Sequence, residues 1–186
     1  MLFSSTESLP EIWQSIKHEL HRGALDPKHP FRYVNLGTTG ENFPQVRTVV
    51  LREVTLELEF LVFTDYRSEK VREIQTSSQV ALHFYHPKKM LQIRVEAKAE
   101  IHFQNELAEQ YWKKIPDGRK SEYTGRHAPG APISNPDMGW EMSEKSFFTV
   151  LKISPQQIEA LQLSKAGHLR IQFEKGNQWE GRWLVP

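Results

Sequence analysis

The fold of this chain is decided by residues 47–70, which read RTVVLREVTLELEFLVFTDYRSEK. Two β-rich runs, Val46–Val54 and Leu56–Thr64, flank a charged turn, and a helix start follows the second run. Alternating side chains of the second run share one face, as in a half-buried strand; they are Leu56, Leu58, Phe60 and Val62. The stretch therefore predicts a pair of strands that leads into a helix.

The end of this stretch carries an arrangement suited to phosphate. Ser68 is expected to cap the helix, which places Lys70 just inside the helix N-terminus. Free backbone N–H groups, a hydroxyl and an ammonium at such a position favour an anion. Arg47, on the preceding strand, can add a bidentate contact. We call Arg47, Ser68 and Lys70 the phosphate clamp.

Plain structural roles stay open for the same residues. Ser68 and Lys70 can serve only to start a helix, and Arg47 and Arg52 can be ordinary arginines of a strand surface. Strict alternation also places Arg47 and Arg52 on opposite faces. Both would then reach one ligand only at a strand end or with a β-bulge.

Composition limits the classes of function. The chain, residues 1–186, fits one domain, and its 24 basic and 23 acidic residues give a net charge of +1. That balance argues against nucleic acid as a partner. The absence of cysteine excludes disulfides, thiolate metal sites and cysteine nucleophiles. The start, MLFSSTESLP, does not resemble a signal peptide, and no apolar run is long enough to span a membrane, so we expect a soluble, cytoplasmic protein.

An N-terminal helix is predicted from a capping box at Ser8–Glu11, with Gly23 as its stop. Its apolar positions recur at helical spacing and are Ile12, Trp13, Ile16 and Leu20. His18 and His21 lie three residues apart without a third ligand nearby, so we interpret them as solvated helix surface and predict no metal site.

Further strands and helices follow the deciding stretch or precede it. Leu91–Phe103 alternates apolar and polar residues along its length, and so long a strand is typical of one that curves through a barrel. Helices are predicted at Glu69–Ser77 and Asn105–Ile115. The other predicted strands are Phe31–Leu36, Gln79–Tyr85, Phe147–Ile153, Gln157–Leu163, His168–Glu174 and Gln178–Leu184. Many short strands with few helices indicate a mainly β barrel with peripheral helices.

Residues 116–146 form the least regular stretch, with four prolines and four glycines. A loop of this length in a compact domain is usually functional or disordered. Arg119, Arg126 and His127 make the loop a candidate lid or substrate edge, and a plain connector is the alternative.

Four motifs together resemble one protein family. They are RTVVLR at 47–52, FTDYRSEK at 63–70, QIRVE at 92–96 and the PxxIE-type segment Pro155–Glu159. With them the chain resembles the pyridoxamine-5′-phosphate-oxidase-like FMN-binding split barrels, from the helix of Trp13 to the closing WLVP. It looks most like their branch of flavoproteins without a well-defined substrate. The resemblance implies a single FMN-binding split-barrel domain with an N-terminal helix.

The resemblance also implies which residues meet FMN. The phosphate clamp matches the family's phosphate region, which agrees with the arrangement inferred from the residues themselves. The backbone of Arg47–Arg52 would lie along the isoalloxazine ring. The implied cofactor-binding residues are Arg47, Thr48, Val49, Val50, Leu51, Arg52, Phe63, Thr64, Ser68, Lys70, Gln92 and Arg170. Tyr111 and His168 match positions on the substrate side, and no catalytic acid or base is named.

Four positions depart from the family pattern. Glu69 stands where the family often has a second phosphate-binding arginine, and Leu161 replaces a tryptophan that commonly packs at the flavin. Ile115 and Ala166 stand where pyridoxamine phosphate oxidases place arginines for the substrate. Because an unpaired phosphate dianion is costly to desolvate, a different small substrate is expected.

Taken with the resemblance, these residues predict a homodimeric oxidoreductase that binds FMN at the subunit interface and acts on a small molecule. A flavin reductase or haem-degrading split barrel is one alternative. A non-catalytic protein that binds FMN or another small ligand is a second. An oligonucleotide-binding barrel would need a basic face with exposed aromatic residues, which the near-neutral charge does not favour.

Overall fold

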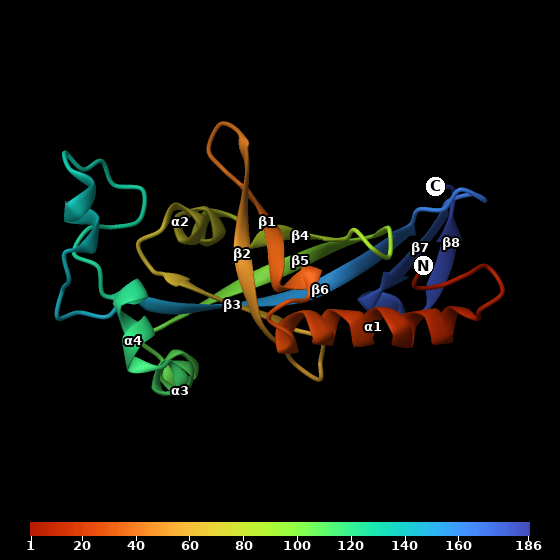
Figure 1. Cartoon of the computed structure of the whole chain (residues 1–186), viewed down its shortest axis with the longest axis horizontal. Helices are drawn as coiled ribbons and strands as arrows, with labels where there is room; N and C mark the ends of the chain where they lie inside the picture. The colour runs from red at the N-terminus through yellow and green to blue at the C-terminus, as the bar shows by residue number, and fades with distance from the viewer.

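The computed structural model describes residues 1–186 as a mainly β protein built on a closed barrel. The barrel consists of six strands in the order β3-β2-β1-β4-β5-β6, and pairing of β3 with β6 closes it. These strands are β1 (Tyr33–Thr39), β2 (Pro44–Val54), β3 (Phe60–Asp65), β4 (Gln79–His86), β5 (Leu91–Phe103) and β6 (Phe148–Gln162). Beyond β6 the sheet continues with β7 (Leu169–Glu174) and β8 (Gly181–Leu184), near both chain termini (Figure 1). The predicted split barrel is confirmed.

The longest strands, β5 and β6, run from one end of the molecule to the other (Figure 1). β5 begins and ends where the alternation predicted, and its inward side chains are buried over most of its length. The prediction of two separate strands at Phe147–Ile153 and Gln157–Leu163 is wrong, since they form the single strand β6. A β-bulge at Gln156 takes up the residues between them, so the polar run at this point does not break the strand.

The strand predicted at Leu56–Thr64 is shorter than expected. Residues 55–59 form a turn in which Leu58 has a left-handed φ of 66° and Leu56 is 95% exposed. β3 starts only at Phe60, and it is buried on both faces rather than one. One face lies in the barrel core, whereas Leu61 packs in an outer cluster with residues of a neighbouring helix. A strand covered on both sides needs no alternation.

Two other strands begin later than predicted. The segment Pro30–Arg32 is a 3₁₀ turn, so β1 starts at Tyr33 rather than Phe31. β8 starts at Gly181 rather than Gln178, because Gln178 and Trp179 lie in a turn with left-handed φ angles of 53° and 63°.

The N-terminal helix α1 (Leu9–Leu25) packs its apolar face on the barrel core. The capping box is confirmed, with Ser8 N donating to Glu11 Oε2 at 2.9 Å. Gly23 does not end the helix. It lies inside α1 because Phe31 packs so closely that a Cβ at this position would meet the Phe31 Cβ at 2.7 Å.

Three more helices and the irregular loop surround the opposite end of the barrel. They are α2 (Glu69–Thr76), α3 (Glu106–Lys114) and the short α4 (Asp117–Lys120). In Figure 1 the rest of the loop, through residue 146, projects beyond α4 at the end farthest from β7 and β8. None of the helices combines the length and apolar character that crossing a membrane would require.

Candidate functional site

β2 contains a β-bulge of the kind that Arg47 and Arg52 would need in order to reach one ligand from opposite faces of the strand. The ladder with β3 shifts by one residue between Leu51 and Glu53, so Arg52 is the extra residue. The two arginines nevertheless go to separate places. Arg47 turns toward α2, whereas the guanidinium of Arg52 lies 5.7 Å from the ring centroid of Phe63.

The phosphate clamp is assembled at the start of α2. Lys70 Nζ donates to Thr64 Oγ1 at 3.1 Å, and the hydroxyls of Thr64 and Ser68 are 3.3 Å apart. Arg47 faces the same helix and forms an ion pair with Glu73, with 2.8 Å between Nη2 and Oε2. The structure thus brings Ser68 and Lys70 to one helix N-terminus, places Arg47 against the next turn of the same helix, and adds Glu73, which the sequence did not indicate.

The clamp has the electrostatics of an anion site. Burial, followed by repulsion from Arg47, lowers the pKa of Lys70, and its only hydrogen bond to a side chain goes to the neutral hydroxyl of Thr64. Ser68 occupies the N-cap position, but its hydroxyl makes no capping bond. The N–H groups of Glu69 and Lys70 therefore have no acceptor within the chain, whereas Val71 N donates to Ser68 O at 3.0 Å. A phosphate would compensate the lysine and accept from those groups, so the residues fit the phosphate of FMN.

A cavity of about 180 Å³ adjoins Arg52 and is lined by Arg52, Phe63, Tyr111, Lys114, Ile115, Pro116, Arg119, Glu122 and Tyr123. Arg52 Nε is buried there without a hydrogen-bond partner. Arg119, from the irregular loop, reaches this cavity, whereas Arg126 pairs with Glu141 and is 70% exposed. Three cationic side chains around one cavity suit the binding of a negatively charged group.

The two predicted substrate-side residues lie in different parts of the chain. Tyr111 lines the Arg52 cavity and donates from its hydroxyl to Glu53 Oε2 at 2.9 Å. Burial, together with that hydrogen bond, raises the pKa of Tyr111 to about 12, so the phenol stays protonated. His168 precedes β7 in an exposed turn, where its Nδ1 accepts from Ser164 N at 3.2 Å. One chain does not bring Tyr111 and His168 together.

Gln92 and Arg170 belong to the outer face of the sheet at the β7 end. The register places Gln92 opposite Leu161 and Leu161 opposite Arg170, so the three side chains form a row. Arg170 Nη2 donates to Glu159 Oε2 at 2.8 Å. β7 pairs with one end of β6 at Gln157–Gln162, whereas β3, the neighbour of β2, pairs with the other end at Phe148–Ile153. At ~3.3 Å per residue, Leu161, the partner of Arg170, lies roughly 26 Å along β6 from Ile153. A ring lying on β2 and Arg170 of the same chain therefore do not meet.

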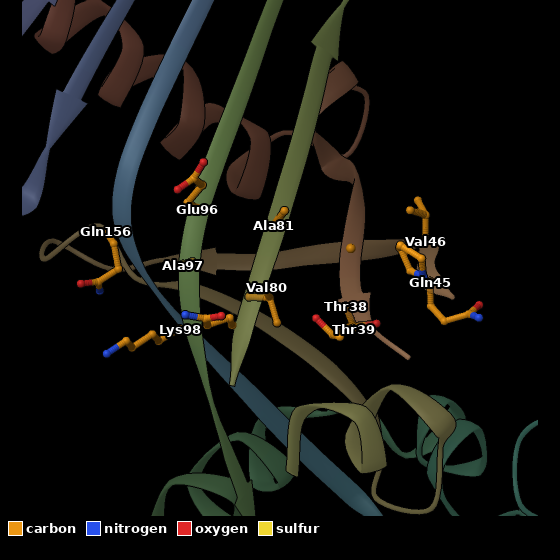
Figure 2. A pocket seen from close by; sticks show the side chains of 13 residues that line it. Thr38, Thr39, Gln45, Val46, Val80, Ala81, Glu96, Ala97, Lys98 and Gln156 are labelled. Atoms are coloured by element: carbon orange, nitrogen blue, oxygen red, sulfur yellow. The ribbon is translucent and has the colours of Figure 1, made fainter. Parts of the chain in front are cut away.

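A shallow hollow of about 500 Å³ lies on the outer sheet face between these two groups. Figure 2 shows Thr38, Gln45, Glu96 and Lys98 around it, on strands β1, β2 and β5. It is lined by none of the predicted cofactor residues, although Val46 at its rim is 71% exposed. The hollow marks an uncovered part of the sheet rather than the site itself.

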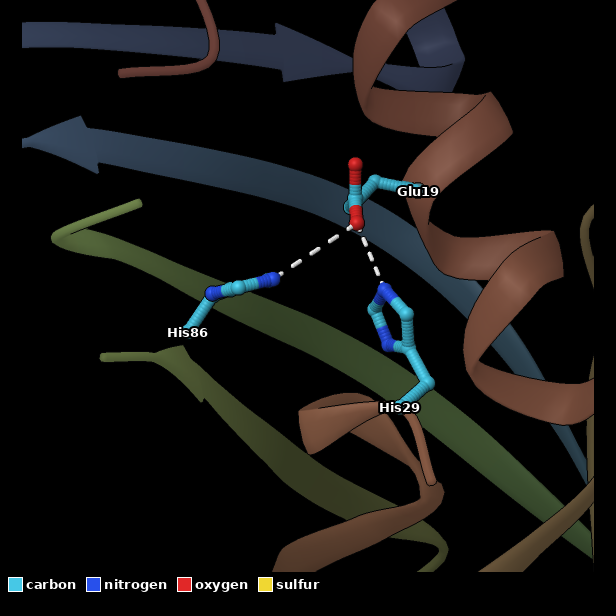
Figure 3. A group of neighbouring side chains, drawn as sticks. All are labelled: Glu19, His29 and His86. Carbon is cyan, nitrogen blue, oxygen red and sulfur yellow. Dashed lines mark hydrogen bonds and ion pairs between the residues drawn. The ribbon is translucent and has the colours of Figure 1, made fainter. Parts of the chain in front are cut away.

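A buried charged cluster joins α1 to the turn between β4 and β5 (Figure 3). Glu19, which is 1% exposed, accepts from His29 Nε2 at 2.5 Å and forms an ion pair with Lys89. His86 Nε2 lies 3.9 Å from the same carboxylate. Burial alone would raise the pKa of Glu19, but hydrogen bonds from Lys89 and His29 outweigh it and lower the pKa.

The protonation of this cluster favours an ion pair over a cation site. Nδ1 of His29 accepts from Phe31 N at 3.1 Å, and Nδ1 of His86 accepts from Lys89 N at 3.2 Å. Each neutral ring then carries its proton on Nε2, toward Glu19. A metal would need those Nε2 atoms unprotonated and would compete with the Lys89 ammonium for the carboxylate. We therefore interpret the cluster as structural.

Comparison with known proteins decides the family. The family model for the FMN-binding domain of pyridoxamine 5′-phosphate oxidase matches residues 10–103, a range that contains the phosphate clamp and Gln92. The chain belongs to this family. The match also assigns FMN as the cofactor, in agreement with the prediction made from the sequence and with the fit of the clamp.

Curated relatives extend the similarity to most of the chain. A pyridoxine/pyridoxamine 5′-phosphate oxidase of Leptospira biflexa is 29% identical, over 96% of this chain and 88% of the relative. A second oxidase of the same description, from Hydrogenovibrio crunogenus, is 30% identical, over 81% of this chain and 77% of the relative. The similarity to the Leptospira protein therefore extends beyond residues 10–103, through the loop and into the C-terminal strands.

Solved structures share the fold at lower identity. A pyridoxamine 5′-phosphate oxidase-related, FMN-binding protein of Nostoc punctiforme superposes with a TM-score of 0.77 at 22% identity, over 100% of both chains. The protein PhzG of Burkholderia lata, solved in complex with tetrahydrophenazine-1-carboxylic acid, gives the same TM-score at 16% identity, over 100% of this chain and 98% of that chain. These similarities show a common split-barrel fold.

Proposed function

We propose that the protein is an FMN-dependent oxidoreductase that acts on a small, negatively charged molecule. The proposal depends above all on the arrangement along β2, with an anion clamp near Arg47 and a cationic cavity at Arg52. The segment between them, Thr48–Leu51, would carry the flavin ring along its backbone. Cofactor phosphate and substrate would thus occupy the two ends of one strand.

The residues of the chain have positioning and electrostatic roles in this proposal. FMN, when bound, supplies the electron-accepting centre. Lys70 and the first turn of α2 would hold its phosphate, and the half-buried Arg52 would place positive charge beside the ring and the substrate. Tyr111, kept neutral by its raised pKa, would present a phenol to the same cavity. No side chain is assigned as acid or base.

A second copy of the chain would complete the site. Gln92 and Arg170 lie too far from β2 to meet the same ring within one chain, and the outer sheet face between them carries exposed apolar side chains. Tyr33 is 64% exposed, Val46 is 71% exposed and Tyr85 is 42% exposed. A two-fold dimer would cover this face and carry Arg170 of each copy toward β2 of the other.

The catalytic part of the proposal is tested by the redox state of the bound flavin. Purified protein is loaded with FMN and mixed without oxygen with a panel of small amines, alcohols and dihydro compounds, each with and without a carboxylate or phosphate. We expect at least one negatively charged member to bleach the flavin absorbance, and air to restore it. If neutral members bleach as well as charged ones, the cationic cavity does not select the substrate.

The shared site is tested by mixing two variants. Lys70→Met removes the cation of the clamp that has no ion-pair partner in the chain, and Arg170→Gln removes the contact expected from the second copy. Each is expected to weaken FMN binding roughly ten- to hundredfold, the equivalent of one charge-assisted hydrogen bond. In a mixed dimer one site carries both changes and the other carries none.

Refolding the two variants together should therefore restore tight binding of FMN to one site per mixed dimer, measured by fluorescence titration and light scattering. Riboflavin, which lacks the phosphate, should bind with equal affinity to the unchanged protein and to Lys70→Met. A monomer mass with FMN tightly bound, or mixtures no better than either variant, would contradict the shared site.

A further inference from the structure

Arg67 joins the phosphate clamp to the irregular loop. It lies in the turn between β3 and α2, where its Nη2 and Nε donate to the Asp65 carboxylate at 2.7 and 3.1 Å. Its remaining donors reach backbone carbonyls of the loop, Gly125 O at 2.8 Å and Arg126 O at 3.1 Å. The guanidinium also lies 3.4 Å from the ring centroid of Phe147. One planar guanidinium therefore links Asp65 of its own turn to a distant segment.

The loop has few other attachments to the barrel at this point. Its stem is closed by main-chain hydrogen bonds, with Phe147 N donating to Tyr123 O at 2.8 Å and Ser143 N to Thr124 O at 2.6 Å. Tyr66 N donates to Phe147 O at 2.8 Å, again from the β3–α2 turn. Tyr123 is the one buried residue between 116 and 146. A segment with so little buried surface is stable only through such anchors.

The same turn also bears the clamp. Thr64 accepts from Lys70, and Ser68 N donates to Asp65 O at 3.1 Å, so the residues that flank Arg67 on both sides belong to the phosphate site. On the loop side, Tyr123 and Arg119 line the cavity at Arg52. Residues 64–70 thus carry the expected phosphate site and, through Arg67, hold loop residues 125 and 126, which closely follow Tyr123 of the cavity wall.

We propose that Arg67 is a positioning residue through which binding of the FMN phosphate orders loop residues 119–127 over the Arg52 cavity. The proposal rests on the assignment of the clamp to FMN. Phosphate at Lys70 pairs with an ammonium that otherwise bonds only the hydroxyl of Thr64, and it thereby fixes the turn. The fixed turn holds the Arg67 guanidinium against the carbonyls of 125 and 126. Cofactor binding thereby builds the substrate cavity, and by linkage an ordered loop tightens cofactor binding by the same factor.

The test is hydrogen exchange, followed by mass spectrometry with and without FMN. In the unchanged protein FMN should slow exchange of residues 119–127 by about tenfold or more, within the usual range of coupling between two sites. In Arg67→Lys, which keeps the charge but loses the fork, this slowing should disappear while FMN still slows exchange at 64–76. Arg72→Ala, an exposed arginine of α2, is the matched control and should behave as the unchanged protein.

Several outcomes decide the matter. FMN that binds, by fluorescence titration of the same samples, without protecting 119–127 would overturn the role of Arg67 and leave the proposed function standing. Failure of the unchanged protein to bind FMN would overturn both. If Arg67→Lys does not fold, Phe147→Leu removes only the stacking on the guanidinium and should reduce the FMN-dependent protection severalfold. Full protection in either folded variant would contradict the proposal.

Discussion

Replacing Glu19 with alanine is expected to lower the free energy of unfolding by about 3–5 kcal/mol, the usual cost of breaking a buried ion pair from one side. The carboxylate is 1% exposed and is the acceptor for the Lys89 ammonium and for His29 Nε2. Its loss leaves the partly exposed Lys89 ammonium and the buried ring N–H of His29 without their acceptor. The cluster also joins α1 to the β4–β5 turn, so α1 is expected to separate from the barrel at a lower urea concentration than in the unchanged protein.

Urea unfolding followed by tryptophan fluorescence measures the effect, because Trp13 of α1 stacks on Phe173 with ring centroids 4.7 Å apart. Glu109→Ala, which changes an exposed glutamate of α3, is the matched control and should stay within about 0.5 kcal/mol of the unchanged protein. A Glu19→Ala protein as stable as this control would show that the cluster contributes nothing to stability.

The barrel could be predicted because its strands follow simple periodicity. Leu91–Phe103 alternates without a fault, and the structure returns the same bounds for β5. The predicted strand start at Leu56 was wrong because alternation does not distinguish a strand from an apolar turn. Only the pairing of Phe60 with Ile153 sets the true start of β3. The prediction of two strands in place of β6 was wrong for a similar reason, since pairing with β5 keeps the strand continuous through the bulge at Gln156.

The phosphate clamp could be predicted because its parts are close in sequence or one strand apart. The part that Glu73 plays at the clamp could not be predicted, since its ion pair with Arg47 depends on how α2 lies on the barrel. Glu19 did carry a signal, because it occupies the apolar face of a helix between Ile16 and Gly23. The histidines that it meets, His29 and His86, come from two other segments and gave none.

The structure changes the basis for excluding pyridoxamine phosphate as a good substrate. From the sequence, the family's two substrate arginines are replaced by Ile115 and Ala166. Ile115 does line the Arg52 cavity, but Arg119 reaches the same cavity from the loop and supplies a cation there. Ala166 has no such replacement in the turn before β7, where Lys165 beside it is exposed. One of the two missing contacts is thus recovered within the chain and the other is not.

Oxidation of pyridoxamine phosphate is therefore expected to be slow, well below the ~1 per second of an ordinary enzyme. One missing charge-assisted contact costs about 1.5–3 kcal/mol, or roughly ten- to a hundredfold. Ala166→Arg should recover that factor in pyridoxal phosphate formation by FMN-loaded protein under air. Lys165→Arg places an arginine at the neighbouring exposed position and should recover nothing. Turnover of about one per second or faster by the unchanged protein would contradict the prediction, and its loss in Arg119→Ala would assign the phosphate to the loop arginine.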